Sequence, residues 1–246
     1  MDELVAKFVE RRKGKIDEAG AREKLTNDVN YFGTMLVFTD KVGGLVSGAI
    51  HSTGDTVRPA LQIVKTKPEY NKVAGCFILR KDEEVYLFAD GGVNLDPSAE
   101  DLAETAIQTA ETAKKFGIDP KVAMLSFSTM GSASSDEVTK VQEATKLAKE
   151  KAPDLDVDGE LQFDAAFVPE VAALKAPDSK VAGKANVFIF PNLAAGNIGY
   201  KLVQRLGGFA AIGPLLQGLN APINDLSRGC NEKDVYELAI VTAATM

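Results

Sequence analysis

The feature that most constrains the fold is a regular alternation of short apolar segments with longer amphipathic segments. The apolar segments have the length of buried strands, and the amphipathic segments repeat their apolar residues at helical spacing. Chains of this kind form an α/β sandwich with a mostly parallel sheet, and their sites lie beyond the carboxyl ends of the strands. We therefore expect an α/β sandwich.

The expected elements follow from these segments. Helices are predicted over residues 2–12, 18–25, 31–38, 60–64, 98–116, 136–151, 168–174 and 194–206, with a last helix after Asn231. Strands are predicted over residues 44–49, 73–79, 85–89, 121–127, 161–167 and 185–190, with a last apolar segment over 209–216. The strands 73–79 and 85–89 are expected to be neighbours, possible partners in a hairpin.

Two breaks in this pattern, near Lys67-Pro68 and Gly213-Pro214, suggest that one domain is inserted into another. We predict a discontinuous first domain over residues 1–69 and 214–246, and an inserted second α/β domain over residues 70–213. The first and last portions would then pack together.

Charge and composition exclude several kinds of site. The formal net charge of −7 argues against broad binding of nucleic acid or of an anionic membrane, and no apolar run is long enough to span a bilayer. Cys76 and Cys230 show no metal-ligand spacing and suggest a reducing, cytoplasmic location. With His51 as its one histidine, the chain is a poor candidate for a Ser-His-Asp hydrolase or for a histidine-rich metal site, so no metal is expected.

A first candidate site lies in residues 222–234, PINDLSRGCNEKD. Asn231 followed by Asp234 has the spacing of a helix N-cap with an acidic partner, and the turn before it carries Ser227 and Arg228. The segment thus collects a hydroxyl, a guanidinium and a carboxylate at a helix start that can bind an anion. Local spacing alone favours the simpler interpretation, in which Asn231 and Ser227 are caps and Asp234 complements the helix dipole.

A second candidate is the segment HSTGDTVRP over residues 51–59, between an apolar strand and a helix. Ser52 and Thr56 offer hydroxyl donors, and Arg58 can bind two oxygens of one phosphate. The segment lacks the Gly-Lys-Ser/Thr of a P-loop. An ordinary capped helix explains the local pattern equally well.

Two further segments could contact anions. The first predicted helix ends in a basic run that includes Arg12, which is either an anion contact or a solvated helix end. The Ser/Thr-rich segment 128–135 is either an anion site or a capped helix start, and the second is the commoner explanation.

Together, several long motifs resemble those of the phosphate acetyltransferases, or phosphotransacetylases, in the order in which that family carries them. The most specific are VSGA at 46–49, HSTGDTVRPA at 51–60, VAMLSFST at 122–129, DGELQFDAA at 158–166, ANVFIFP at 185–191 and PINDLSRGC at 222–230. The resemblance implies a two-domain three-layer α/β/α sandwich with mostly parallel sheets and an interdomain active-site cleft. It also implies a cytoplasmic homodimer.

The reaction that the resemblance implies is reversible transfer of an acetyl group between acetyl phosphate and coenzyme A, with release of phosphate. Coenzyme A and acetyl-CoA are then substrates, and no tightly bound cofactor, nucleic acid or membrane partner is expected. Acyl-chain length cannot be read from the motifs, so a butyryltransferase of the same kind remains an alternative.

Residue roles are carried over from the family by matching positions. Asp234 matches the base that removes the thiol proton, Ser227 a residue that hydrogen-bonds the thiol or the intermediate, and Arg228 a residue that stabilises developing charge. The match places Ser52, Thr56 and Arg58 in the anion-binding loop and links Arg12 to coenzyme A. Lys201 is a weaker candidate for a phosphate contact, and could equally be a surface lysine on a helix.

One departure from the family bears on activity. Family members carry further strands and helices before the position that matches Met1. A non-catalytic ligand-binding fragment is therefore a second alternative, because the supporting sheet would be incomplete and would present an exposed edge.

Overall fold

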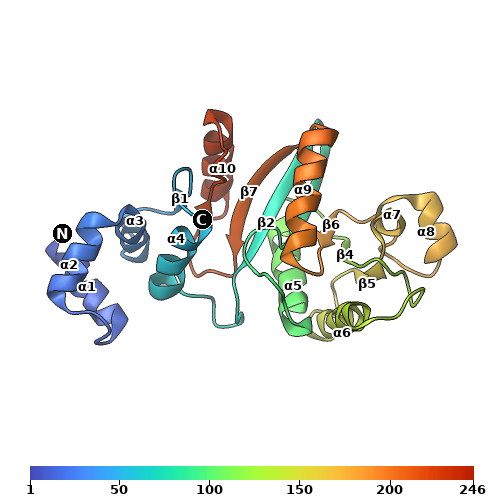
Figure 1. Ribbon diagram of the computed structural model, residues 1–246, viewed down its shortest axis with the longest axis horizontal. Coiled ribbons are helices and arrows are strands. Elements are labelled where there is room, and N and C mark those ends of the chain that lie inside the picture. The colour runs from blue at the N-terminus through green and yellow to red at the C-terminus, as the bar shows by residue number, and fades with distance from the viewer. The chain divides into compact units, whose positions relative to one another are not determined.

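The computed structural model describes residues 1–246. The chain forms two compact units (Figure 1). Unit 1 comprises Met1–Val73 and Gly213–Met246, and unit 2 comprises Ala74–Ile212. None of the helices has the length and the apolar composition that crossing a membrane requires.

Helices form the N-terminal part of unit 1: α1 (Asp2–Arg12), α2 (Glu18–Asn27), α3 (Val29–Phe38), α4 (Thr53–Pro59) and the π-helical turn η1 (Ala60–Val64). The helix α1 ends at Arg12 because Lys13 and Gly14, which follow it, take left-handed backbone conformations. Apolar residues at helical spacing on α1 pack with α2, α3 and η1 around Phe8, Met35 and Ile63, which are at most 1% exposed. Each of these side chains contributes about 1.5–3 kcal/mol by leaving water.

The remainder of unit 1 is built on two short parallel strands, β1 (Leu45–Ser47) and β8 (Ile223–Asp225). They contact α3 and α4, and also α10 (Glu232–Ala244). Asn224 of β8 is buried. Its Oδ1 accepts from the Leu216 N–H at 2.9 Å, and its Nδ2 donates to the Thr242 hydroxyl at 2.9 Å. A buried amide with both ends satisfied holds β8 and α10 together.

Unit 2 contains a mostly parallel sheet in the order β5-β4-β6-β3-β2-β7. Its strands are β2 (Ala74–Lys81), β3 (Glu84–Ala89), β4 (Val122–Leu125), β5 (Val157–Leu161), β6 (Val187–Ile189) and β7 (Ala210–Gln217). The neighbouring pairs β3–β6, β6–β4 and β4–β5 are parallel, whereas β2 and β3 form the expected antiparallel hairpin. The strand β7 continues past Ile212 into unit 1.

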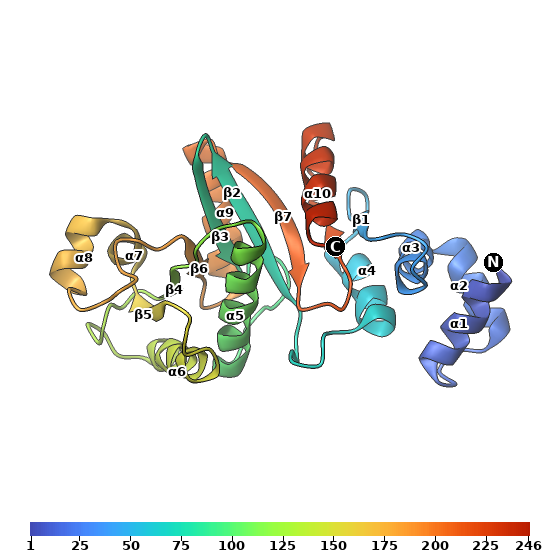
Figure 2. The same cartoon turned by 180° about the vertical axis from the view of Figure 1, so that it is seen from behind.

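Helices cover both faces of this sheet. They are α5 (Ala99–Lys115), α6 (Asp136–Lys151), α7 (Phe163–Phe167), α8 (Pro169–Lys175) and α9 (Leu193–Gly207). Figures 1 and 2 show α9 and α5 on opposite faces, each in front in one of the two views. The α/β class and the mostly parallel sheet expected from the alternation of segments are thus confirmed.

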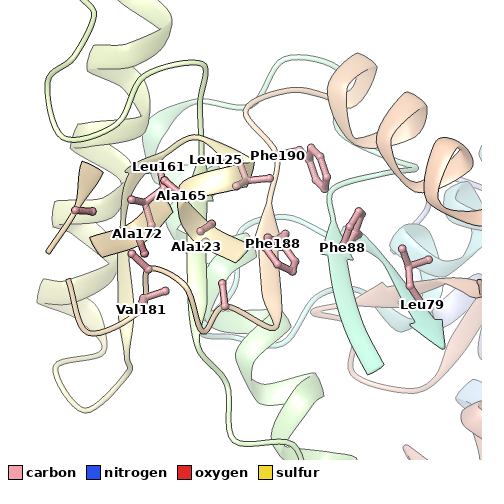
Figure 3. Close-up of a cluster of buried hydrophobic side chains, with 14 of the residues drawn as sticks. Leu79, Phe88, Ala123, Leu125, Leu161, Ala165, Ala172, Val181, Phe188 and Phe190 are labelled. Carbon is pink, nitrogen blue, oxygen red and sulfur yellow. The ribbon is translucent and has the colours of Figure 1, made fainter. Parts of the chain in front are cut away.

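On the α7–α9 face, aromatic and small side chains fill the core of unit 2 (Figure 3). Phe88 of β3 and Phe188 of β6 meet edge to face with ring centroids 5.3 Å apart, and Phe190 lies 5.1 Å from Phe88. Alanines of α7 and α8, including Ala165 and Ala172, pack beside these rings. Small residues opposite large ones let the helices approach closely and fill the interior to native density.

Three local expectations were wrong. The predicted strand 161–167 is a strand that ends at Leu161 followed by the helix α7, because its apolar residues Phe163 and Phe167 stack at helical spacing, 5.6 Å apart. The loop 51–59 is helical from Thr53 onward, so its helix starts before residue 60. Residues 223–225 form a strand that was not expected, since three residues show no period.

Candidate active site

Parallel pairing of β1 with β8 brings the two candidate segments to the same edge of unit 1. Ser47 stands opposite Asp225 in the register, and the Leu226 N–H donates to the Ser47 carbonyl at 2.7 Å. Both strands therefore end at the same level. The chain after β1 leads to His51–Arg58, and the chain after β8 leads to Ser227–Asp234. This arrangement places both segments at the carboxyl ends of parallel strands, where sites form in α/β folds.

The start of α4 is fixed by a capping box between Ser52 and Asp55. The Ser52 hydroxyl donates to Asp55 Oδ2 at 2.7 Å, and the Ser52 N–H donates to the same oxygen at 3.0 Å. These two bonds hold the pKa of Asp55 below its usual range, with smaller contributions from Arg58 and His51. The capped-helix interpretation is thus confirmed here, and Arg58 is left exposed one helical turn further along.

Thr56 lies behind this surface, where it is fully buried. Its hydroxyl donates to Asp225 Oδ1 at 2.8 Å, a contact that joins α4 to the end of β8. The structure therefore places Thr56 under the candidate site, with its proton already engaged by a carboxylate.

The turn after β8 carries the other three candidates. Ser227 and Arg228 are exposed, and the Ser227 hydroxyl accepts from the Gly229 N–H at 3.3 Å. The predicted capping box is confirmed: Asn231 Oδ1 accepts from the Asp234 N–H at 3.1 Å, and Asp234 Oδ2 accepts from the Asn231 N–H at 2.9 Å. Half-buried Asp234 thus holds the helix start, and one of its carboxylate oxygens is fixed in place.

Arg12 and Arg58 both affect the pKa of one buried side chain, that of Tyr31, although they are far apart in sequence. Burial and the nearby carboxylate of Asp28 raise the pKa of the Tyr31 phenol, and the charges of Arg12 and Arg58 oppose this shift. The Tyr31 hydroxyl donates to Gln62 Oε1 at 2.9 Å. The pKa of Tyr31 thus reflects charges from both the end of α1 and α4, within unit 1.

Lys201 is the one predicted site residue that belongs to unit 2. It lies on α9, it is exposed, and its ammonium group donates to Asn197 Oδ1 at 2.6 Å. This is an i to i+4 contact along one helix face. Its local geometry is that of a surface lysine whose ammonium group is bound by a neighbour on the same helix.

The other Ser/Thr-rich segment of unit 2 is occupied by a side chain of the protein. Ser128 Oγ donates to buried Glu160 at 2.8 Å, and the Gly131 N–H donates to the same Oε1 at 2.7 Å. Burial raises the pKa of Glu160, but these donors together outweigh burial and lower it. The helix start at Ser135 is capped in the ordinary way, through the Val138 N–H at 3.2 Å. This segment therefore already binds a carboxylate of its own.

Comparisons with known proteins decide the family. A model of the family described as "Phosphate acetyl/butaryl transferase" matches residues 1–243. The chain belongs to this family. It is 65% identical to a phosphate acetyltransferase of Bacillus subtilis over 244 residues, which is 99% of this chain and 75% of the relative. The family assignment and the acyltransferase class expected from the sequence are thereby confirmed.

Solved structures of the family have the same fold. A phosphotransacetylase from Streptococcus pyogenes superposes with a TM-score of 0.94 at 61% identity, covering 99% of this chain and 74% of that one. The EutD phosphotransacetylase of Staphylococcus aureus gives a TM-score of 0.91 at 62% identity, with the same coverage. The chain thus spans about three quarters of the length of the family members that it matches.

Asp225 is a buried residue of the site that the sequence did not single out. Its burial depends on the β1–β8 pairing, and its partner Thr56 is 169 positions away. The available signal was a carboxylate directly before Leu226-Ser227-Arg228, without any local partner.

Proposed function

We propose that the edge where β1 and β8 end transfers an acetyl group between acetyl phosphate and the thiol of coenzyme A, with release of phosphate. The observation that carries the proposal is the parallel pairing of these strands, which brings the Arg58 segment to the Ser227–Asp234 turn. One segment offers a guanidinium for a phosphate, and the other offers a carboxylate, a hydroxyl and a second guanidinium.

Asp234 is the proposed base. Its Oδ2 is held by the Asn231 N–H, which leaves the other carboxylate oxygen to accept the thiol proton. A carboxyl group and a thiol have reference pKa values of about 4 and about 8.5, so complete transfer before attack is uphill. The proton therefore moves as the sulfur bonds to the carbonyl carbon. The carbon–oxygen bond to phosphate then breaks, and the leaving phosphate takes up the proton.

The other side chains of the site bind the substrates and stabilise the charge that develops during the reaction. The exposed Ser227 hydroxyl orients the thiol or donates to the intermediate. Arg228 offers paired donors to the oxyanion and to the departing phosphate. Arg58 binds the phosphate of acetyl phosphate with Ser52, whose hydroxyl must then turn away from Asp55, and Thr56 holds α4 in place from below. The assignment of Lys201 to a phosphate contact stays a prediction from the sequence.

Acyl-chain length is the main alternative, because the family includes both acetyl and butyryl transferases. Relatives at 62–65% identity are named phosphate acetyltransferases, which favours the acetyl group. We expect kcat/KM to be higher with acetyl phosphate than with butyryl phosphate when both are assayed at saturating coenzyme A. The reverse order would assign the chain to the butyryl branch. Ligand binding without turnover of either substrate would indicate a non-catalytic binding fragment.

Arg12 is proposed to bind a phosphate group of coenzyme A. We expect Arg12→Ala to raise the KM for coenzyme A by about tenfold or more and to leave kcat within a few-fold, because a contact remote from the reacting atoms acts through binding. Neighbouring Lys13→Ala, which removes a similar positive charge, is the matched control. Steady-state kinetics with coenzyme A as the varied substrate measure this, and a fall in kcat at unchanged KM would contradict the assignment.

We also propose that the protein is a homodimer. An apolar hollow of about 390 Å³ on unit 2 is lined by aromatic and aliphatic side chains that include Phe163, Phe167, Leu202 and Leu206. Leu206 is 83% exposed. Exposed apolar patches of this kind are typical of interaction surfaces. We expect a sedimenting species of twice the chain mass, which Leu206→Glu converts to monomer and Leu174→Glu, a similarly exposed leucine outside the hollow, does not.

A further inference from the structure

A buried carboxylate lies beneath the candidate site and has no role in the proposed chemistry. Asp225 ends β8 and is 1% exposed. Aspartate side chains are almost never buried to this extent unless they have partners, because removing the charged group from water is costly. Such a residue in the middle of a site therefore calls for an explanation.

The contacts of Asp225 connect both segments of the site. Its Oδ1 accepts from the Thr56 hydroxyl at 2.8 Å, and the Leu226 N–H also stabilises its charge. Thr56 lies two positions before Arg58 on α4, and Asp225 lies three positions before Arg228. The backbone of Gly48 packs so closely against Asp225 that a Cβ atom there would clash with Oδ1. One carboxylate thus joins the chain after β1, the start of α4 and the turn after β8.

The second oxygen of Asp225 is not satisfied by any of these contacts. Its Oδ2 is buried and has no hydrogen-bond donor. Burial raises the pKa of this carboxyl group, whereas the hydroxyls of Thr53 and Thr56, the Leu226 N–H and the charge of Arg228 oppose the shift. The Thr56 hydroxyl is the side-chain donor that contacts this carboxylate directly, and the same hydrogen bond fixes α4 to the end of β8.

We propose that Asp225 is a positioning residue for acyl transfer, which holds the Arg58 helix against the end of β8 through Thr56. The inference rests on the proposed function of the same site. Its consequence is that the helix carrying Arg58 keeps a fixed position relative to the end of β8, from which the turn with Arg228 continues. Asp225 itself does not touch the substrate.

The test uses substitutions that remove the charge or the hydrogen bond and change the shape very little. We expect Asp225→Asn to lower kcat/KM for acetyl phosphate by about 10–100-fold, the range for one hydrogen bond to a charged group, and to leave the KM for coenzyme A nearly unchanged. Asp40→Asn is the matched control, because Asp40 is exposed and its positive φ suits asparagine equally well. Circular dichroism establishes that both variants are folded at the assay temperature.

The KM for acetyl phosphate distinguishes a positioning role of Asp225 from a role in protein stability alone. A variant that is only less stable loses active molecules, and its KM for acetyl phosphate stays the same. We expect that KM to rise in Asp225→Asn. Kinetic constants equal to those of Asp40→Asn in a folded protein would overturn the inference.

If Asp225→Asn does not fold, two variants of Thr56 test the inference instead. Thr56→Val removes the donor and keeps the shape, whereas Thr56→Ser keeps the hydroxyl. We expect Thr56→Val to show the acetyl phosphate defect and Thr56→Ser to lie much closer to wild type, and equal behaviour of the two would overturn the inference. Where the Asp225→Asn/Thr56→Val double variant folds, its loss should not exceed that of the more severe single variant, because Asp225→Asn weakens and Thr56→Val removes the same hydrogen bond. An inactive wild-type chain would instead refute the proposed function itself.

Discussion

Asp234→Asn lowers kcat by about 10²–10⁴-fold, the contribution expected of a general base. The asparagine side chain keeps an oxygen that can accept from the Asn231 N–H, so the capping box at the start of α10 is retained. What is lost is the ability to take the thiol proton. Steady-state turnover of acetyl phosphate with coenzyme A measures the effect.

The control for Asp234→Asn comes from the same helical turn. Glu232→Gln also converts an exposed carboxylate of the first turn of α10 into an amide, and it should leave turnover within a few-fold of wild type. Near-normal kcat in a folded Asp234→Asn protein would reject Asp234 as the base and leave it as a helix cap only.

Arg228→Lys is expected to reduce kcat by about 10²-fold or more, although the positive charge is kept. A guanidinium offers paired donors in one plane, and a lysine ammonium cannot reproduce that geometry. Stabilisation of a developing oxyanion depends on such fixed donors, whose removal typically costs about 10²–10³-fold in kcat. Arg22→Lys, at an exposed ion pair with Asp2, is the matched control and should have little effect.

Arg58→Lys extends this prediction to the other segment. It should act mainly on the KM for acetyl phosphate, because Arg58 is proposed to bind the anion. If both arginines bind one acetyl phosphate molecule, the losses in the double variant are non-additive. Strictly additive losses, or wild-type kinetics of Arg228→Lys, would contradict a shared site.

Segments whose apolar residues repeat at regular helical spacing were predictable from the sequence, because interactions between residues close in sequence determine their structure. The helix α1 shows its apolar residues at helical spacing and ends where Lys13 and Gly14 leave the helical conformation. The capping box at Asn231 and Asp234 was likewise visible, since its two residues are three positions apart. The family motifs added the expected reaction and its residues.

What the sequence did not predict depends on contacts between distant segments. The strand β8 has three residues and exists because β1 pairs with it, so no local pattern marks it. Residues 163–167 are apolar enough for a strand, but their aromatic side chains pack on Phe188 from a helix. Asp225 and Thr56 meet only after both strands are in register, so no local pattern marks Asp225 as buried.

The most direct test of the account is the formation of acetyl-CoA by the purified wild-type chain. Acetyl phosphate and coenzyme A are supplied together, and thioester formation and phosphate release are followed in parallel with the Asp234→Asn protein. We expect wild type to form thioester and phosphate in equal amounts, and the variant to form both at a rate lower by orders of magnitude. Equal rates in the two proteins, or phosphate release without thioester, would contradict it.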